Sequence, residues 1–256
     1  MKNKKESLGI EKANLFAQET SRRKFLQYSG LAVVGGSLVL AGCSDDDDNS
    51  GPPDTEIFDL GSGNLGILNY AYALEQLEAA FYKQVVNGSY WQNADAEEKQ
   101  ILEDLYEHET IHRDFFKTAI SAAVSSELML PELEFDFSSV NFGDRDSVLQ
   151  TSVILEDTGV AAYNGAGSLI DASDATGAVY LTLAGKIVSV EARHASAVRN
   201  LLNPGSINFA SPDVLVNLAG SGKAYDKAIA PAGILSAVKA TGFITTEFTA
   251  NNLPTS

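Results

Sequence analysis

The stretch VSVEARHASAVR, residues 188–199, determines the choice of fold because it carries two ionisable residues in an otherwise apolar helical pattern. Glu191 and His194 are three residues apart, and at roughly 100° per residue such positions share one helix face. Ile187 and Val198 belong to the same face, so this face is expected to point into a protein core. Because a buried carboxylate is costly without a partner, the pattern predicts that other segments supply compensating groups or a cation.

The same spacing recurs in EHETIHRDF, residues 107–115, where Glu109 precedes His112 by three positions. Two further segments each carry a glutamate that is followed seven residues later by a tyrosine: Glu75 with Tyr82, and Glu156 with Tyr163. The interval from the lone glutamate to the glutamate of the Glu-x-x-His pair is 34 residues in the first half and 35 in the second. The chain is therefore an approximate repeat, in which each half supplies one lone glutamate and one Glu-x-x-His pair.

Helical spacing and end signals predict four long helices, over about residues 65–86, 95–124, 145–172 and 175–202. Asn93 or Asp95 is expected to cap the second helix. Short links follow the first and third helices, which favours antiparallel neighbours, whereas residues 131–144 contain Pro and Gly and form a longer link. The predicted fold is all-α: an antiparallel four-helix bundle with a crossover between helices 2 and 3. Residues 204–256 are predicted to be a less regular extension with a short helix or two, packed on the bundle.

Six side chains from the four helices form the expected metal site: Glu75, Glu109, His112, Glu156, Glu191 and His194. Four glutamates and two histidines are the ligand inventory of a carboxylate-bridged dinuclear centre in a helix bundle. Four carboxylates balance the charge of two divalent ions, which bridging holds about 3.5–4 Å apart. Carboxylate and imidazole ligands suit iron or manganese, and the sequence does not distinguish two Fe from two Mn ions.

The chain resembles the ferritin-like superfamily, and within it the exported ferritin-like and desiccation-related proteins. The resemblance is carried by LNYAYALEQLEAAFY (68–82), HETIHRDF (108–115) and VEARHASAVR (190–199), and it covers about residues 63–203. It implies that the six side chains are metal ligands and that Tyr82 and Tyr163 lie near the metals as tentative catalytic residues. No Cys-x-x-Cys pair is present, so an electron-transfer domain of the rubrerythrin kind is not expected.

The sequence leaves several assignments of ligands and of their partners open. Glu78 rivals Glu75 as the ligand from the first helix, and the tyrosines are equally consistent with core aromatics that hydrogen-bond a glutamate. His108 is expected to flank the site, and Asp157 is a candidate partner for a histidine ring nitrogen. A bundle without metal would instead pair its inward glutamates with arginines; the available ones are Arg113, Arg193 and Arg199.

The N-terminal residues 1–42 have the features of an export signal. SRRKFLQ (21–27) resembles a twin-arginine motif, and a short apolar run ends in LAGC (40–43), which resembles a lipobox with Cys43 as the lipidated residue. The acidic, Gly- and Pro-containing residues 43–62 are expected to form a flexible tether. Removal of residues 1–42 takes away 7 Lys/Arg and 3 Asp/Glu, which changes the net charge from −16 to −20 and disfavours nucleic acid as a partner.

The leading functional hypothesis is a lipid-anchored protein of the cell envelope, on the periplasmic face or the outer surface, that binds two Fe or two Mn ions. Its expected partners are metal ions and, through Cys43, a membrane. Oxidation of Fe(II), consumption of oxygen or peroxide, or oxidation of a small organic substrate fits such a site, so an oxidoreductase is one interpretation. The alternatives are a non-catalytic stress- or desiccation-related envelope protein and an iron-buffering lipoprotein.

Overall fold

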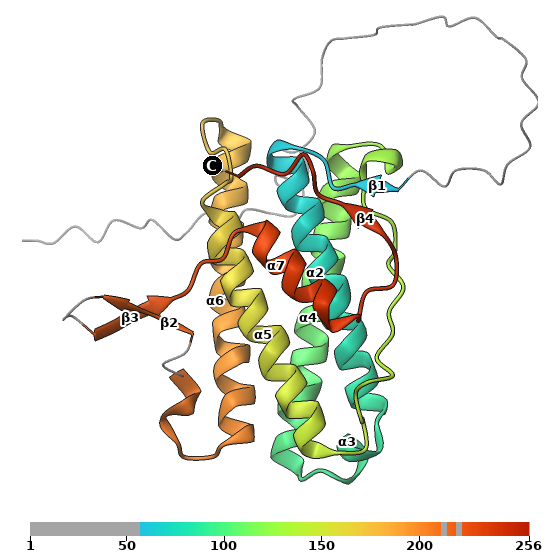
Figure 1. The fold of residues 1–256 in the computed structure, drawn as a ribbon, viewed down its shortest axis with the longest axis vertical. Coiled ribbons are helices and arrows are strands. Elements are labelled where there is room, and N and C mark those ends of the chain that lie inside the picture. The colour runs from blue at the N-terminus through green and yellow to red at the C-terminus, as the bar shows by residue number, and fades with distance from the viewer. Residues whose placement is uncertain (1–56, 211–213, 219–221, 256) are drawn as a thin grey trace, which may run out of the picture.

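Four long helices lie side by side and form the body of the molecule (Figure 1). They are α2 (Gly63–Asn87), α4 (Ala96–Ala123), α5 (Arg145–Gly167) and α6 (Ala175–Leu202), with the short helix α3 (Ser89–Asn93) between α2 and α4. The structure is a computed structural model, and it describes residues 57–210, 214–218 and 222–255. The all-α four-helix bundle predicted from the sequence is confirmed. The expected signal segment, Cys43 and most of the tether lie outside the described residues.

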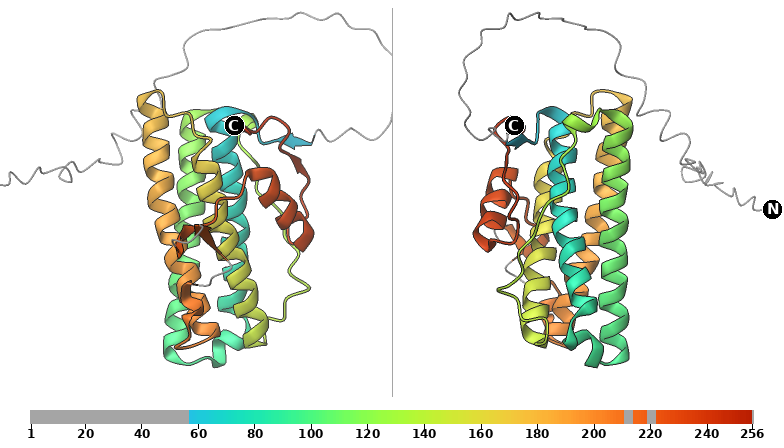
Figure 2. Two further views of the ribbon diagram at one scale, coloured as in Figure 1. Left: turned by 60° about the vertical axis from the view of Figure 1, so that its left-hand side comes forward. Right: turned by 90° about the vertical axis from the view of Figure 1, so that its right-hand side faces the viewer.

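A long connection returns the chain along the bundle between α4 and α5, as both views in Figure 2 show. Two amides on α2 hold this connection in place. The side chain of Asn69 accepts a hydrogen bond from Leu130 N at 3.0 Å, and that of Gln76 accepts one from Leu133 N at 2.9 Å. Because the chain travels the length of the bundle here, α4 and α5 run in the same direction, whereas α2 and α6 run opposite to them (Figure 1). The predicted crossover is confirmed.

Aspartates fix the starts of three of these helices. Asp95 accepts hydrogen bonds from the backbone N–H groups of the first turn of α4, and Asp144 and Asp174 do the same for α5 and α6. α6 has the predicted bounds, but α5 ends at Gly167 and not near residue 172 as predicted. The reason is local: two glycines weaken its last turn, and the Ser168 hydroxyl donates to the Gly165 carbonyl oxygen at 2.8 Å, which closes the helix in a turn.

The residues after α6 form a layer on the outside of the bundle and contain more strand than predicted. The remaining elements are η1 (Ser126–Leu128), η2 (Ile207–Ala210), β1 (Phe58–Asp59), β2 (Leu215–Leu218), β3 (Gly222–Asp226), α7 (Pro231–Thr241) and β4 (Phe248–Thr249). β2 pairs antiparallel with β3, and β4 pairs parallel with β1. Ile234 and Val238 of α7 are buried, so this helix packs on the body through its apolar face. Among the described residues, no helix has the length and apolar character needed to span a membrane.

Candidate metal centre

The bundle interior contains a cluster of ionisable side chains at a level where an apolar core would be expected. The carboxylates of Glu75, Glu109, Glu156 and Glu191 have no exposed surface, and His112 and His194 are also buried. Each of the four long helices contributes at least one of these residues, and the structure brings all six predicted side chains together. Charged side chains are almost never buried to this extent without partners.

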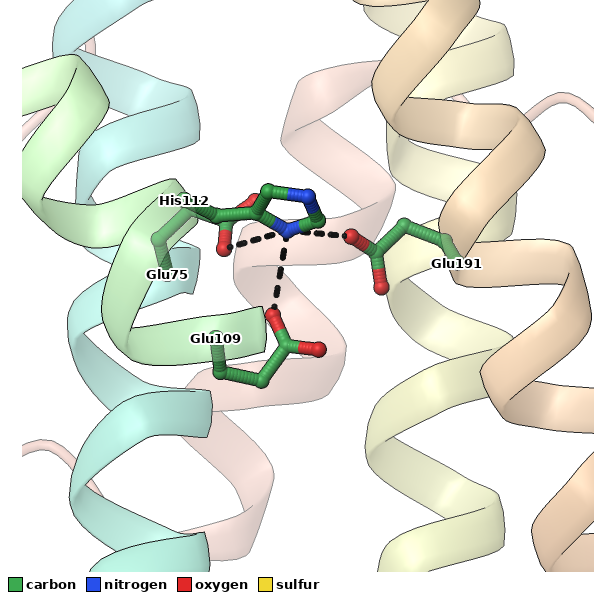
Figure 3. A group of neighbouring side chains, drawn as sticks. All are labelled: Glu75, Glu109, His112 and Glu191. Carbon is green, nitrogen blue, oxygen red and sulfur yellow. Dashed lines mark hydrogen bonds and ion pairs between the residues drawn. The ribbon is translucent and has the colours of Figure 1, made fainter. Parts of the chain in front are cut away.

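Four of these side chains meet around one point, and Figure 3 shows them. The Nδ1 atom of His112 lies 2.9 Å from Glu191 Oε1, 3.3 Å from Glu109 Oε2 and 3.4 Å from Glu75 Oε2 (Figure 3). Each residue directs one ligand atom to this point, and the four atoms lie within 4.8 Å of one another. We call Glu75, Glu109, His112 and Glu191 the Glu75 group.

A second point lies beside the first. The Nδ1 atom of His194 lies 2.6 Å from Glu109 Oε1 and 3.5 Å from one oxygen each of Glu156 and Glu191. We call Glu109, Glu156, Glu191 and His194 the Glu156 group. Glu109 and Glu191 belong to both groups, and each uses one oxygen for each point. The two imidazole centroids are 6.3 Å apart. This geometry is compatible with two adjacent cation positions that share two carboxylates.

The inward atoms of the cluster are poorly satisfied by the protein itself. Within the described part of the chain, the side-chain atoms without a hydrogen-bond partner include Glu75 Oε2, Glu109 Oε1, Glu156 Oε2, both carboxylate oxygens of Glu191, and His194 Nδ1. Among the described ion pairs the partners of these carboxylates are the two imidazoles alone, and burial of several carboxylates with so few cationic partners is costly. All of these inward atoms are oxygen or imidazole nitrogen, which divalent ions of the iron and manganese type accept. The residues present therefore fit a bound metal ion.

Two tyrosines hold the glutamates that are not shared. The Tyr82 hydroxyl donates to Glu156 Oε1 at 2.6 Å, and the Tyr163 hydroxyl donates to Glu75 Oε1. Each tyrosine therefore binds the glutamate of the other half of the repeat. Burial and the nearby carboxylates raise the pKa of both phenols, so they remain protonated donors. These bonds occupy one carboxylate oxygen and leave the other facing the cluster.

His108, which was expected from the sequence to flank the site, contacts the ring nitrogen of His194 that faces away from the cluster. His108 Nδ1 lies 2.9 Å from His194 Nε2, and the two rings stack with centroids 5.1 Å apart. A partner on the outer nitrogen fixes the orientation of an imidazole ligand. The prediction of Asp157 for such a role is wrong. Asp157 is one residue from Glu156 and so points to another side of α5, where it accepts a hydrogen bond from Arg199 Nε at 2.9 Å.

Glu78, which the sequence left as a rival to Glu75, is a fifth buried glutamate in the cluster. It is 3% exposed, and its Oε2 atom has no hydrogen-bond partner among the described residues. Its Oε1 atom lies 3.1 Å from the position that a Cβ atom on Gly159 would take, and Glu191 Oε2 lies 3.8 Å from the same position. Glu75 and Glu78 therefore both reach the interior, but of the two only Glu75 belongs to a group of converging ligand atoms among the described residues. Gly159 leaves the space that the Glu78 carboxyl group occupies.

The arginine-paired bundle is not observed. Arg113 hydrogen-bonds Asp114, Arg193 hydrogen-bonds Ser189, and Arg199 pairs with Asp157. The glutamates of the two groups instead have only the two histidines as cationic partners among the described ion pairs. The physical reason is the position of the arginines on their helices. Arg113 directly follows His112 and Arg193 directly precedes His194, so both point to another side of the helix than the histidine.

The contacts within the cluster shift the pKa values of its histidines and glutamates. Burial lowers the pKa of His194, but its contacts with Glu109, Glu156 and Glu191 outweigh burial and raise the pKa to about 12. The pKa of His112 is raised by the same balance. Burial raises the pKa of Glu156 to about 7, although the contact with His194 opposes this shift. A metal ligand must be deprotonated, so a cation that enters this site displaces protons.

A known protein family matches more than half of the chain. Residues 63–204 match the family described as a ferritin-like domain, a span that contains all four long helices and every member of the cluster. No curated protein matches the chain.

Proposed function

The chain belongs to the ferritin-like domain family, and from this and the buried cluster we propose that it binds two ions of iron or manganese and uses them to oxidise Fe(II) or to consume oxygen or peroxide. The observation that carries the proposal is the sharing of Glu109 and Glu191. Each directs one oxygen towards His112 and the other towards His194. Membership of the family alone would not support it, because one fold serves many functions.

The charge of the cluster favours two cations over one. The four glutamates of the two groups carry four negative charges when ionised, and two divalent ions balance them. With a single ion, protons on the remaining ligands would have to balance the other two carboxylates, because unbalanced charge is unfavourable in a low-dielectric interior. Glu75 and His112 would hold one ion, Glu156 and His194 would hold the other, and Glu109 and Glu191 are placed to contribute to either position. When bound, two such ions supply a pair of one-electron changes, which matches the two-electron reduction of dioxygen or of peroxide.

The protein's own residues would hold the site in shape during such a reaction. Tyr82 and Tyr163 fix one oxygen of each unshared glutamate, and His108 fixes the ring of His194. Glu78 is the member of the cluster with no assigned ion. Burial and the surrounding carboxylates raise its pKa well above the usual range, so it holds a proton close to the site.

Metal analysis of the purified protein, expressed without its first 43 residues, tests this proposal. About two Fe or Mn ions per chain and Fe(II)-dependent oxygen or peroxide consumption are expected. A folded protein that binds no metal would refute the proposal and would favour the non-catalytic envelope protein. Bound metal without turnover would favour an iron buffer. Glu107→Gln, on the exposed side of α4, is the control for Glu109→Gln, which should abolish binding.

We also propose that the protein is exported and anchored through a lipid on Cys43. The support is the order of the twin-arginine-like motif, the apolar run and the LAGC sequence. Labelling of cells with a radioactive or clickable fatty acid should mark the wild-type protein and leave Cys43→Ser unlabelled. Equal labelling of both proteins would exclude this anchor.

A further inference from the structure

A small apolar cavity lies between the four long helices, next to the metal cluster. Its volume is about 30 Å³. Ala71 of α2, Phe116 of α4, Ala162 of α5 and Ile187 of α6 contribute to its wall, so each helix supplies part of the lining. These four side chains are buried and carry no polar atom. The cavity is therefore an apolar space inside the bundle.

The cavity adjoins the Glu75 group more closely than the Glu156 group. Ala71, Phe116 and Ile187 each lie one helical turn from a member of the Glu75 group, and all on the same side of it. Tyr163 also lines the cavity, and its hydroxyl donates to Glu75. Tyr163 thus links the wall of this space directly to the Glu75 group.

The opposite end of the cavity leads towards the end of the bundle. Asn64 at the start of α2, Gly167 at the end of α5 and Tyr180 near the start of α6 line this end, and all three are only partly buried. Ala184, which is also partly buried, lines the same cavity from α6. The lining thus passes from partly exposed residues at the bundle end to fully buried residues beside the cluster.

We propose that this cavity is the docking site and entry route for dioxygen, an inference that rests on the proposed function and names its oxidant. Size selects a very small occupant. A cavity of about 10–15 Å³ holds one water molecule, and one of about 150 Å³ holds benzene, so 30 Å³ admits a diatomic gas and excludes an organic substrate.

Polarity selects dioxygen among the small oxidants. Hydrogen peroxide and hydrated metal ions would lose their hydrogen bonds to water in this apolar wall, a loss of several kcal/mol. Tyr70 contributes one buried hydroxyl that has no partner among the described residues, which cannot replace the several hydrogen bonds of peroxide. Dioxygen is apolar and loses no hydrogen bonds on entry.

Crystals of the metal-free protein, pressurised with krypton, test the cavity without any use of activity. A krypton peak among Ala71, Phe116 and Ile187 is expected in the wild type and should be absent in Ala184→Leu, whose larger side chain fills the space. Ala197→Leu is the matched control, because Ala197 is a partly buried alanine of the same helix outside this cavity, and it should retain the peak. Absence of krypton from the wild-type cavity would overturn the inference.

Stopped-flow oxidation of the Fe(II)-loaded proteins then tests the oxidant. Ala184→Leu should slow the reaction with dioxygen by at least about tenfold, equivalent to roughly 1.4 kcal/mol, while its reaction with peroxide stays within about twofold of wild type. Ala197→Leu should match the wild type with both oxidants. An unchanged dioxygen rate, or equal slowing with both oxidants, would overturn the inference.

The two proposals fail in different ways. If the wild-type protein binds no metal, the proposed function is wrong, and the assignment of dioxygen falls with it whatever krypton shows. If metal binds but krypton does not enter, or if the filled cavity leaves the dioxygen rate unchanged, only the dioxygen route is wrong.

Discussion

Replacement of one shared and one unshared glutamate should remove different numbers of ions. Glu109 contacts both imidazoles, with Oε1 2.6 Å from His194 Nδ1 and Oε2 3.3 Å from His112 Nδ1. Of the two imidazoles, Glu156 contacts that of His194 alone, at 3.5 Å. Glutamine keeps the shape of either side chain but removes its charge. Glu109→Gln should therefore lose both ions, whereas Glu156→Gln should retain about one per chain.

The size of the effect follows from ligand linkage. At a metal concentration about 100 times the dissociation constant, each bound ion stabilises the folded state by roughly 2.7 kcal/mol. For a domain of this size, each kcal/mol raises the melting temperature by about 2–4 °C. The metal-dependent rise is then roughly 10–20 °C for two ions and 5–10 °C for one. The rise should vanish in Glu109→Gln and be halved in Glu156→Gln.

The assay is metal content per chain together with calorimetric melting of each protein with metal and with a chelator. The difference between the two melting temperatures cancels any effect of the substitution on the metal-free fold. Glu107→Gln, on the exposed side of α4, should retain both ions and the full rise. Equal loss of metal in Glu109→Gln and Glu156→Gln would refute the sharing of Glu109.

Three further outcomes are expected. Metal affinity should fall on acidification by about tenfold per pH unit for each proton displaced. The reason is that His194, with its pKa raised to about 12, and Glu156, with its pKa raised to about 7, must give up protons to bind metal. Titration calorimetry in buffers of different ionisation enthalpy counts these protons, and a pH-independent affinity would contradict the assignment. His108→Ala should weaken binding at the Glu156 group by about 10–100-fold without changing the two-ion stoichiometry at saturation, and His108→Gln should restore part of it. Tyr82→Phe should destabilise the metal-free protein by roughly 1–3 kcal/mol in urea unfolding, because it leaves Glu156 Oε1 without its donor; an unchanged midpoint would show that this bond is not formed.

The parts of the structure that depend on nearby residues could be predicted from the sequence. Positions three apart share a helix face, so the pairing of Glu191 with His194 follows from the residue spacing. Asp95 marks the start of α4 for an equally local reason, since its side chain accepts the first free N–H groups. The long link with Pro and Gly indicated the crossover.

The parts that depend on which helices face each other could not be predicted. The crossed bonds from Tyr82 to Glu156 and from Tyr163 to Glu75 join residues 74 and 88 positions apart. Glu78 lies in the cluster because α5 has a glycine opposite it, which no pattern within α2 reveals. The end of α5 was missed because a serine hydroxyl and two glycines outweigh the apolar pattern that continues beyond them.

The departures from the repeat make the Glu75 group and the Glu156 group, the two proposed ion positions, unequal. Both halves supply an unshared glutamate, a tyrosine and a Glu-x-x-His pair, so the frame of the site is nearly symmetric. The position three residues after the unshared glutamate, however, is Glu78 in α2 and Gly159 in α5. The residue before the Glu-x-x-His pair is His108 in α4 and Val190 in α6, so only His194 has an imidazole partner on its outer nitrogen. The residues that the two halves share would balance the charge of two ions equally. The positions at which the halves differ could then make one proposed ion differ from the other in affinity or in exposure to an oxidant. The apolar cavity adjoins the Glu75 group more closely than the Glu156 group. The reaction with dioxygen is therefore expected to begin at the ion held by the Glu75 group.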